Sequence, residues 1–291
     1  MIQVEELSKR YGTTVALDRV TVAIPEGAIW GILGHNGSGK STFLKCLLGF
    51  LLPDSGRVVL EGITQREMGY LAEHVFFPKH EHVADYLHTA GQISGISGST
   101  LRTRVPYLLE QVRLWQARAW QIRDCSKGMR QQLGIAQAIV HDPRLVILDE
   151  PMEGLDPTWQ HRIRAMIRGW RAVGKTVLMS THRLSDITEL CSHVSIFRSG
   201  RVVTAGKLDE VLVPQPRVTI VVTLLNTTLL EDLTSLHPQI QVEQNTITLA
   251  AEAVPLKETV LYRLLDGGAE IIQLTHERRS LEELYLEAMS A

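Results

Sequence analysis

The stretch Gly34–Thr42, with the sequence GHNGSGKST, constrains the fold of this chain more than any other feature. It satisfies G-x-x-x-x-G-K-[ST], follows an apolar run at 28–33 (AIWGIL) and precedes a run with helical spacing (STFLKCLLGFL). Strand, glycine loop and helix open a nucleotide-binding α/β unit. Glycines let backbone N–H groups point at a phosphate chain, and the helix adds the positive end of its dipole. The flanking strand and helix favour a phosphate-binding loop over a plain glycine turn.

The residue types in this loop predict which of them bind the phosphates and which binds the metal. Lys40 is expected to reach the β- and γ-phosphates, and the Ser41 hydroxyl is expected to ligate Mg²⁺. The loop residues expected to contact the nucleotide are Gly34, His35, Asn36, Gly37, Ser38, Gly39, Lys40, Ser41 and Thr42.

Two carboxylates end a second apolar run, Leu145–Glu150 (LVILDE). A buried strand here places Asp149 at its carboxyl end, where it can hold Mg²⁺ through water, and Glu150 can polarise an attacking water as a general base. An apolar strand that ends in two acids is common, so this signal depends on the phosphate loop that precedes it.

Charge and cysteine usage exclude several classes of protein. The chain has 30 Lys plus Arg against 32 Asp plus Glu, so bulk charge gives no reason to expect nucleic-acid binding. The three cysteines lie far apart, which indicates neither a disulfide framework nor a zinc site and predicts a reducing, cytoplasmic setting. The most apolar stretch, 43–52, is shorter than the about 20 residues of a membrane helix, and we expect no signal peptide.

The pattern along the chain predicts two domains. Residues 1–213 carry the motifs above, with a mainly helical region at about 82–141. The segment Pro214-Gln215-Pro216 reads as a linker. Residues 214–291 then follow the order βαββαβα, which is typical of a small α+β domain.

Between the two motifs stands Cys125–Gln132, with the sequence CSKGMRQQ, directly before a helical run. Taken alone, it reads as a serine N-cap beside a glycine. In this position it resembles the LSGGQ signature loop of the ATP-binding subunits of ABC transporters. Ser126 and Gly128 keep the hydroxyl and the bare backbone, whereas Lys127 and Met129 replace the usual glycine and glutamine. The resemblance implies that this loop contacts the nucleotide that a second copy binds, across a dimer interface.

Four further positions fit the same family. The resemblance implies that Tyr11 stacks on adenine, that Asp156 in GLDP belongs to the D-loop, and that His182 in STH is the switch histidine at the γ-phosphate. Glu73 stands where the family's Q-loop usually has glutamine. Its carboxylate can still ligate Mg²⁺ or water, but it adds a negative charge near the phosphates.

The resemblance covers about residues 1–213 and implies a P-loop NTPase fold of the ABC cassette type, with a mixed sheet and a helical subdomain. It implies an ATPase that takes ATP and Mg²⁺, with Glu150 and His182 catalytic and with Ser41, Glu73 and Asp149 at the metal. It also implies a head-to-tail homodimer on a separate integral membrane permease, peripheral to the cytoplasmic face of the inner membrane. The apolar cluster 75–78 is expected either to dock the permease or to fold inward.

The variant loops are familiar among exporters of the bacitracin-resistance and drug-efflux type. A narrower resemblance, carried by GHNGSGK, YLAEHVFFP and SKGMRQQLGIAQA, is to the NosF-type ATPase of nitrous-oxide reductase maturation, which implies copper-site assembly and a periplasmic accessory protein. Two alternatives remain: a non-transport ABC protein acting on ribosomes or DNA, and a regulator without turnover. The second predicts damage at Lys40, Asp149, Glu150 or His182, and all four are intact.

Overall fold

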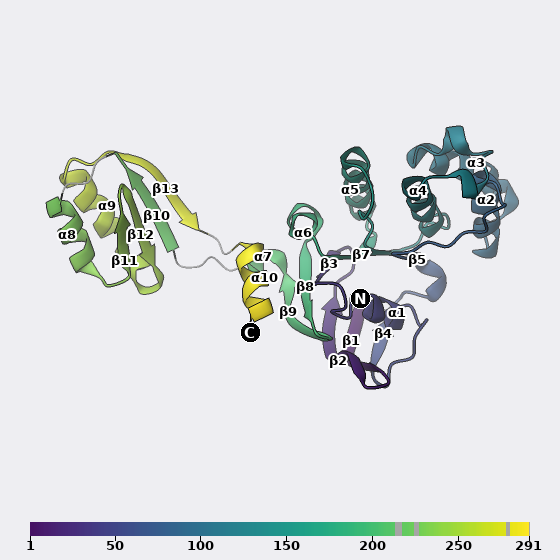
Figure 1. Cartoon of the computed structure of the whole chain (residues 1–291), viewed down its shortest axis with the longest axis horizontal. Coiled ribbons are helices and arrows are strands. Elements are labelled where there is room, and N and C mark those ends of the chain that lie inside the picture. Colours follow the sequence, from purple (N-terminus) through teal and green to yellow (C-terminus); the bar gives the residue numbers. More distant parts are fainter. Residues whose placement is uncertain (213–216, 224–226, 278–279, 291) are drawn as a thin grey trace. The chain divides into compact units, whose positions relative to one another are not determined.

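The computed structural model describes residues 1–212, 217–223, 227–277 and 280–290 and divides into two compact units, Met1–Leu208 and Asp209–Ala291 (Figure 1). The division lies close to the predicted domain boundary at 213/214. The predicted linker, Pro214-Gln215-Pro216, lies outside the described residues.

Two sheets organise the first unit. The smaller is antiparallel, with the order β2 (Thr14–Ile24), β1 (Ile2–Tyr11), β4 (Ser55–Leu60). The larger has the order β5 (Met68–Leu71), β6 (Leu145–Asp149), β7 (Thr176–Thr181), β3 (Ile29–Leu33), β8 (His193–Arg198), β9 (Arg201–Lys207). Its neighbours pair in parallel except for β9, which closes a hairpin at Ser199-Gly200 as the sequence predicts. Every residue of β3, β6 and β7 is buried, which explains why these strands read as largely apolar runs without the alternation of a half-exposed strand.

The helices of this unit are α1 (Lys40–Leu47), α2 (Val83–Ile93), α3 (Gly98–Gln111), α4 (Lys127–Ala138), α5 (Pro157–Ala172) and α6 (Leu184–Leu190), and α7 (Leu208–Val211) follows at its end. Short 3₁₀ turns lie at Gln65–Glu67, Trp115–Ala117 and Ile122–Asp124. Helices α2, α3 and α4 fill the region 82–141 that the sequence predicts as helical. Among the described residues, none of the helices combines the length and apolar character needed to cross a membrane.

Helix α1 ends earlier than its apolar sequence predicts. Gly49 adopts a left-handed φ of 74°, and the N–H groups of Gly49 and Phe50 turn back to the carbonyl oxygens of Cys46 and Lys45. This glycine stop satisfies the last carbonyls of the helix. The segment beyond it leaves the helix axis, so Phe50 is exposed instead of completing an apolar face.

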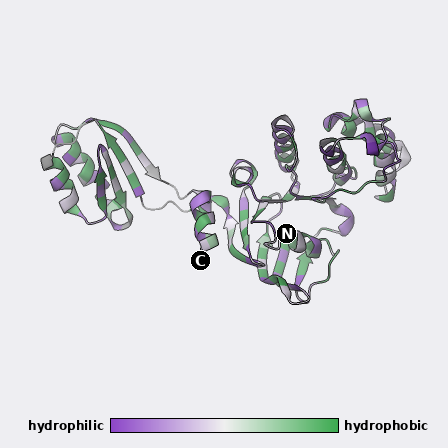
Figure 2. Ribbon diagram, viewed as in Figure 1, coloured by the Kyte–Doolittle hydropathy of each residue, from purple (hydrophilic) through white to green (hydrophobic). Residues whose placement is uncertain are grey.

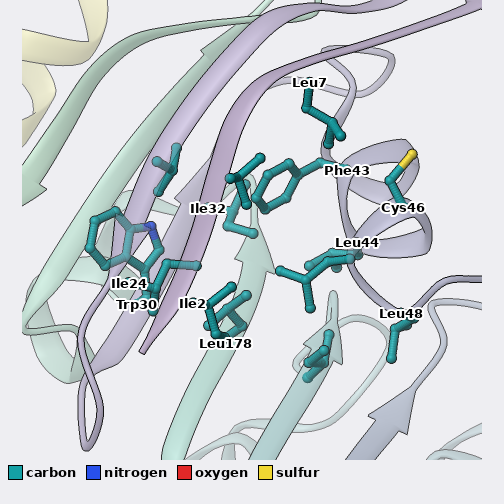
Figure 3. Packing of buried hydrophobic residues seen from close by; sticks show 14 of the residues in the cluster. Ile2, Leu7, Ile24, Trp30, Ile32, Phe43, Leu44, Cys46, Leu48 and Leu178 are labelled. Carbon is teal, nitrogen blue, oxygen red and sulfur yellow. The ribbon is translucent and has the colours of Figure 1, made fainter. Parts of the chain in front are cut away.

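The core of the first unit lies where α1 packs between the two sheets. Figure 3 shows Phe43 of α1 between Leu7 of the small sheet and Ile32 of the large sheet. All three side chains are buried, as are Leu44 and the other members of the cluster. Removing a buried aromatic ring of this kind costs about 3–5 kcal/mol. The packing therefore fixes the start of α1, and with it the glycine loop, against the sheet.

The second unit has the order β10 (Arg217–Val222), α8 (Thr227–Leu236), β11 (Ile240–Glu243), β12 (Thr246–Ala250), α9 (Lys257–Asp266), β13 (Ile271–Glu277), α10 (Leu281–Ser290), with a 3₁₀ turn at Ala251–Leu256. This is the predicted βαββαβα order. Its antiparallel sheet, β11-β12-β10-β13, packs on α8 and α9 through a separate apolar cluster that includes Ile220, Leu233, Ile247 and Leu264. Figure 2 shows hydrophilic and hydrophobic residues mixed along both helices, as expected for helices with one buried face.

Candidate functional site

Parallel pairing brings four predicted site segments to one edge of the large sheet. Strands β5, β6, β7 and β3 are consecutive in that sheet, and Glu73, Asp149–Glu150, His182 and Gly34–Thr42 occur at or just beyond their carboxyl ends. The register aligns Asp149 with Ser180, and Leu33 with Thr181. The carboxyl edge of such a sheet is where ligands bind in open α/β folds.

The glycine loop passes too close to its neighbours for larger residues at two positions. A Cβ on Gly34 would lie 2.5 Å from Ser38 Oγ and 2.6 Å from the carbonyl oxygen of Phe197. Gly39 has a φ of 108°, and a Cβ there would lie 2.5 Å from the carbonyl oxygen of Ala16. Only glycine meets both demands. The loop is therefore held in one compact turn before α1 begins.

Helix α1 begins without a side-chain cap. Gly39 is its N-cap, and within residues 1–212, which are described throughout, no side chain caps this end and no acidic residue stands in its first turn. The first N–H groups of a helix have no partner inside the helix and carry its partial positive charge. The start of α1 is thus open to an anion.

Lys40 and Glu150 form an ion pair beside this loop. The Lys40 amine donates to the carbonyl oxygens of Gly34 at 2.7 Å and His35 at 3.2 Å, and it lies 3.5 Å from Glu150 Oε1. The other carboxylate oxygen, Oε2, lies 3.0 Å from His182 Nδ1. Lys40 and Glu150 are buried, whereas His182 is exposed. The carboxylate therefore lies between a lysine and a histidine that come from two other strand ends.

Ser180 holds the two acids of β6 in place. Its hydroxyl donates to Asp149 Oδ1 at 2.5 Å and accepts from the Glu150 backbone N–H at 2.9 Å. Glu150 itself has a φ of 49°, a left-handed conformation that non-glycine residues seldom adopt. Backbone strain of this kind persists where the surroundings hold it and concentrates at functional sites. The sequence did not predict this role for Ser180, although a polar residue in an apolar strand was a signal for it.

A cavity of about 390 Å³ joins the loop to the acids. Its lining consists of Thr14, Val15, Ala16, Asn36, Gly37, Ser38, Gly39, Lys40, Ser41, Thr42, Glu73 and Glu150. The prediction missed Thr14–Ala16, which enter because the start of β2 runs beside the loop. The signal in the sequence that these residues could lie at the nucleotide site was their position just after Tyr11, which the resemblance places at adenine. Tyr11 is half exposed and does not line the cavity.

The cavity has the donors and acceptors that Mg²⁺ and a triphosphate need. Ser38 Oγ and Glu150 Oε1 are buried and accept or donate no hydrogen bond among the described residues. Burial raises the pKa of Tyr70 to about 12, and the negative charges of Asp149 and Glu73 add to the shift. Both acids thus act on the same side chain of β5. An oxygen-rich, acidic edge beside an open helix start suits a hard cation bound to phosphate.

The signature-like loop forms a second cluster, and none of its residues lines this cavity in the described structure. Ser126 is the N-cap of α4 and accepts from the Met129 N–H at 3.2 Å. Lys127, the first residue of α4, lies 3.8 Å from Glu153, and Gly128 lies beside Leu155. Asp156 caps α5 by accepting from the Trp159 N–H at 3.0 Å. The structure thus joins the signature-like loop to the predicted D-loop, apart from the phosphate loop.

Comparison with known proteins agrees with this architecture. The sequence matches the family described as ABC transporter over residues 17–153. It is 32% identical over 298 residues, which cover 100% of both chains, to a Bacillus subtilis protein described as "Uncharacterized ABC transporter ATP-binding protein YxlF". It is 36% identical over 220 residues, or 73% of each chain, to "Nod factor export ATP-binding protein I" of Cupriavidus metallidurans.

A solved structure described as "Structure of ATP binding subunit of ABC transporter" is similar as well. The TM-score is 0.68 and the identity 30%, over 72% of this chain and 91% of that chain. The solved structure agrees with the fold that the glycine loop, the parallel strands and the signature-like loop predict, and the whole-length relative is described as a protein of the same family. The chain belongs to the ATP-binding subunits of the ABC transporter family.

Proposed function

We propose that this chain hydrolyses ATP and couples binding and hydrolysis to a separate membrane permease. The observation that carries the proposal is the Glu150 carboxylate, held between Lys40 and His182 at the rim of the phosphate-loop cavity. A residue that positions or deprotonates the water and a cation for the phosphates are groups that water attack on ATP uses. The resemblance adds a histidine at the terminal phosphate. All of them come from consecutive strands of one sheet.

The chemistry assigned to these side chains is proton transfer and charge stabilisation. Water attacks the γ-phosphorus, the bond from that phosphorus to the bridging oxygen of ADP breaks, and Glu150 accepts the proton of the water. Lys40 donates hydrogen bonds to two carbonyl oxygens of its own loop and forms an ion pair with Glu150, and it would exchange these partners for phosphate oxygens. His182 would donate to the terminal phosphate.

The donor set also fits a magnesium ion. Ser41 and Glu73 line the cavity, and Asp149 is the last residue of β6, directly before Glu150, which also lines it. A bound Mg²⁺ would neutralise charge on the phosphates of ATP. We assign these three residues to the metal, with Asp149 acting through water and oriented by the hydroxyl of Ser180.

Loss of hydrolysis in Glu150→Gln, with ATP binding kept, tests the enzymatic proposal. The substitution removes the base and preserves the shape of the site, so phosphate release should fall by at least about 100-fold, in the range of a lost general base. A wild-type chain that binds ATP without turnover, alone and with its permease, would instead support the non-hydrolysing regulator.

The partners are proposed from the same family. Two copies would pair head to tail, and a permease would dock beside the Q-loop position at the cytoplasmic face of the membrane, with the chain peripheral there. The structure divides the predicted docking cluster 75–78: the Phe77 ring packs against Tyr86 at 5.0 Å, whereas Phe76 is 90% exposed. Phe76 is therefore the side chain that we assign to the permease contact.

The direction of transport is proposed as export. The relative from Cupriavidus metallidurans is described as a Nod factor export protein, and a Streptococcus pyogenes relative as "Lantibiotic transport ATP-binding protein SrtF". The NosF-type alternative, with copper-site assembly and a periplasmic accessory protein, is narrower. If the chain is of the NosF type, deleting its gene should leave a nitrous-oxide reductase without its copper-sulfide centre. Full reductase activity in the deletion strain would contradict this alternative and leave general export as the proposed function.

A further inference from the structure

Lys127 of the signature-like loop and Glu153 form an ion pair that the function above does not use. The Lys127 amine lies 3.8 Å from Glu153 Oε1. The Lys127 side chain runs across Gly154: its Cε and Nζ would each lie 3.2 Å from a Cβ placed there. The glycine therefore leaves room for the lysine to reach the acid.

Glu153 is also tied to the proposed base. Its N–H donates to the carbonyl oxygen of Glu150 at 3.1 Å, which closes a turn directly after β6. The Glu150 carboxylate faces the cavity, whereas the Glu153 carboxylate faces the start of α4. One turn thus connects the phosphate-loop cavity of a subunit to its signature-like loop.

The ion pair is suited to exchange. The side chains are 69% and 43% exposed, and their separation is long for a charged hydrogen bond. Exposed pairs of this kind contribute about 0–1 kcal/mol. A phosphate with several negative charges attracts a lysine more strongly than one solvated carboxylate does. Lys127 can therefore leave Glu153 at little cost when such a phosphate approaches.

We propose that Glu153 is a positioning residue that holds Lys127 in the open subunit, and that Lys127 transfers to the terminal phosphate of a nucleoside triphosphate held by a second copy. This rests on the head-to-tail dimer of the proposed function. Glycine, the usual residue at this position in the family, has no charge to transfer. Transfer would free Glu153, and with it the turn that follows Glu150, only when a triphosphate is present in the facing site.

The test uses the full-length Glu150→Gln chain with Mg-ATP and measures the dimer dissociation constant by sedimentation. Adding Lys127→Gln should raise that constant by about tenfold per site, the effect of one lost hydrogen bond to a charged group. Adding Glu153→Gln should lower it, by up to about fivefold, because the lysine no longer has a competing partner. Lys79→Gln, at an exposed lysine outside both loops, is the matched control and should change nothing.

If Lys127 transfers to the phosphate, Lys127→Gln raises the dimer dissociation constant and Glu153→Gln lowers it. These opposite changes distinguish transfer from an ion pair that stays in place. A purely structural pair predicts that both substitutions weaken the dimer, and that result overturns the proposal. Lys127→Gln that behaves like Lys79→Gln overturns it too, while leaving the dimer of the proposed function intact. A parent chain that binds ATP yet stays monomeric overturns both. Each variant should keep the ATP affinity of the monomer, which shows that its own phosphate loop is folded.

Discussion

Lys40 contacts three residues in this structure, through two hydrogen bonds and one ion pair, and these contacts hold its amine where a phosphate chain would bind. The amine donates hydrogen bonds to two carbonyl oxygens of its own loop and forms an ion pair with the Glu150 carboxylate. A buried ammonium needs such partners because desolvation disfavours its charge. The same amine is therefore held in position at the place where the phosphates of ATP would arrive.

Replacing Lys40 with Ala should lower ATP affinity by roughly 10- to 100-fold, because charged hydrogen bonds to the phosphates are lost. Isothermal titration calorimetry measures this directly. Lys45→Ala, at an exposed lysine on the same helix, is the control and should bind ATP as the unmodified chain does. Equal affinity in both variants would contradict the assignment of the loop.

Glu73 is the residue that departs from the usual pattern of the family, and it lines the cavity with Glu150. Glu73→Gln should keep ATP binding and alter turnover modestly, since glutamine fills this role elsewhere in the family. Removing one negative charge near the phosphates should raise Mg-ATP affinity by about two- to fivefold at low salt. Complete loss of ATP binding would show instead that Glu73 is a structural anchor.

At the scale of elements, the sequence predicts the strands and turns that depend on local residue patterns. It does not predict contacts between residues that are far apart in the chain. The buried strands β3, β6 and β7 and the hairpin turn at Ser199-Gly200 follow from apolar runs and turn residues. The bridge from Ser180 to Asp149 and the entry of Thr14 into the cavity join segments far apart in the chain. Only the packed sheet brings them together, so no local pattern contains them. The early end of α1 shows that one left-handed glycine outweighs an apolar run.

The packing around two glycines predicts that their substitution by alanine changes the free energy of unfolding in opposite directions. A Cβ on Gly69 of β5 would lie 1.9 Å from the carbonyl oxygen of Ala138, so Gly69→Ala should lower the free energy of unfolding by at least about 1–3 kcal/mol. Gly169 lies inside α5, and among the described residues no atom beyond its two chain neighbours and the nearby backbone of its own helix lies within 4 Å of such a Cβ. Gly169→Ala should therefore raise the free energy of unfolding by about 0.5–1 kcal/mol. Urea denaturation measures both. The same sign for both would contradict this packing.

At the scale of the whole molecule, the two units have separate apolar cores, which indicates that they have different functions. The core of the second unit is formed by residues 218–271, and that of the first by residues 2–202. Every residue that lines the phosphate-loop cavity belongs to the first unit. We infer that the second unit adds dimer contacts or regulation and no catalytic group.

A chain truncated after Pro214 should therefore fold and bind ATP with an affinity within about threefold of the full chain, because every phosphate contact is kept. Circular dichroism establishes that the truncated chain is folded, and calorimetry gives the affinity. A folded, monodisperse truncation that does not bind ATP would contradict this assignment of different functions to the two units and place part of the nucleotide site in residues 215–291.

Nucleotide-dependent dimerisation tests the central claim, that the cavity and the signature-like loop of two copies form one site. Glu150→Gln keeps the shape of the cavity and removes the proposed base, so bound ATP should persist and the closed dimer should accumulate. Sedimentation of this variant should give dimer with Mg-ATP and monomer with Mg-ADP, either alone or bound to its permease. The same oligomeric state with both nucleotides, together with ATPase activity of the unmodified chain that is strictly linear in its concentration, would contradict the claim.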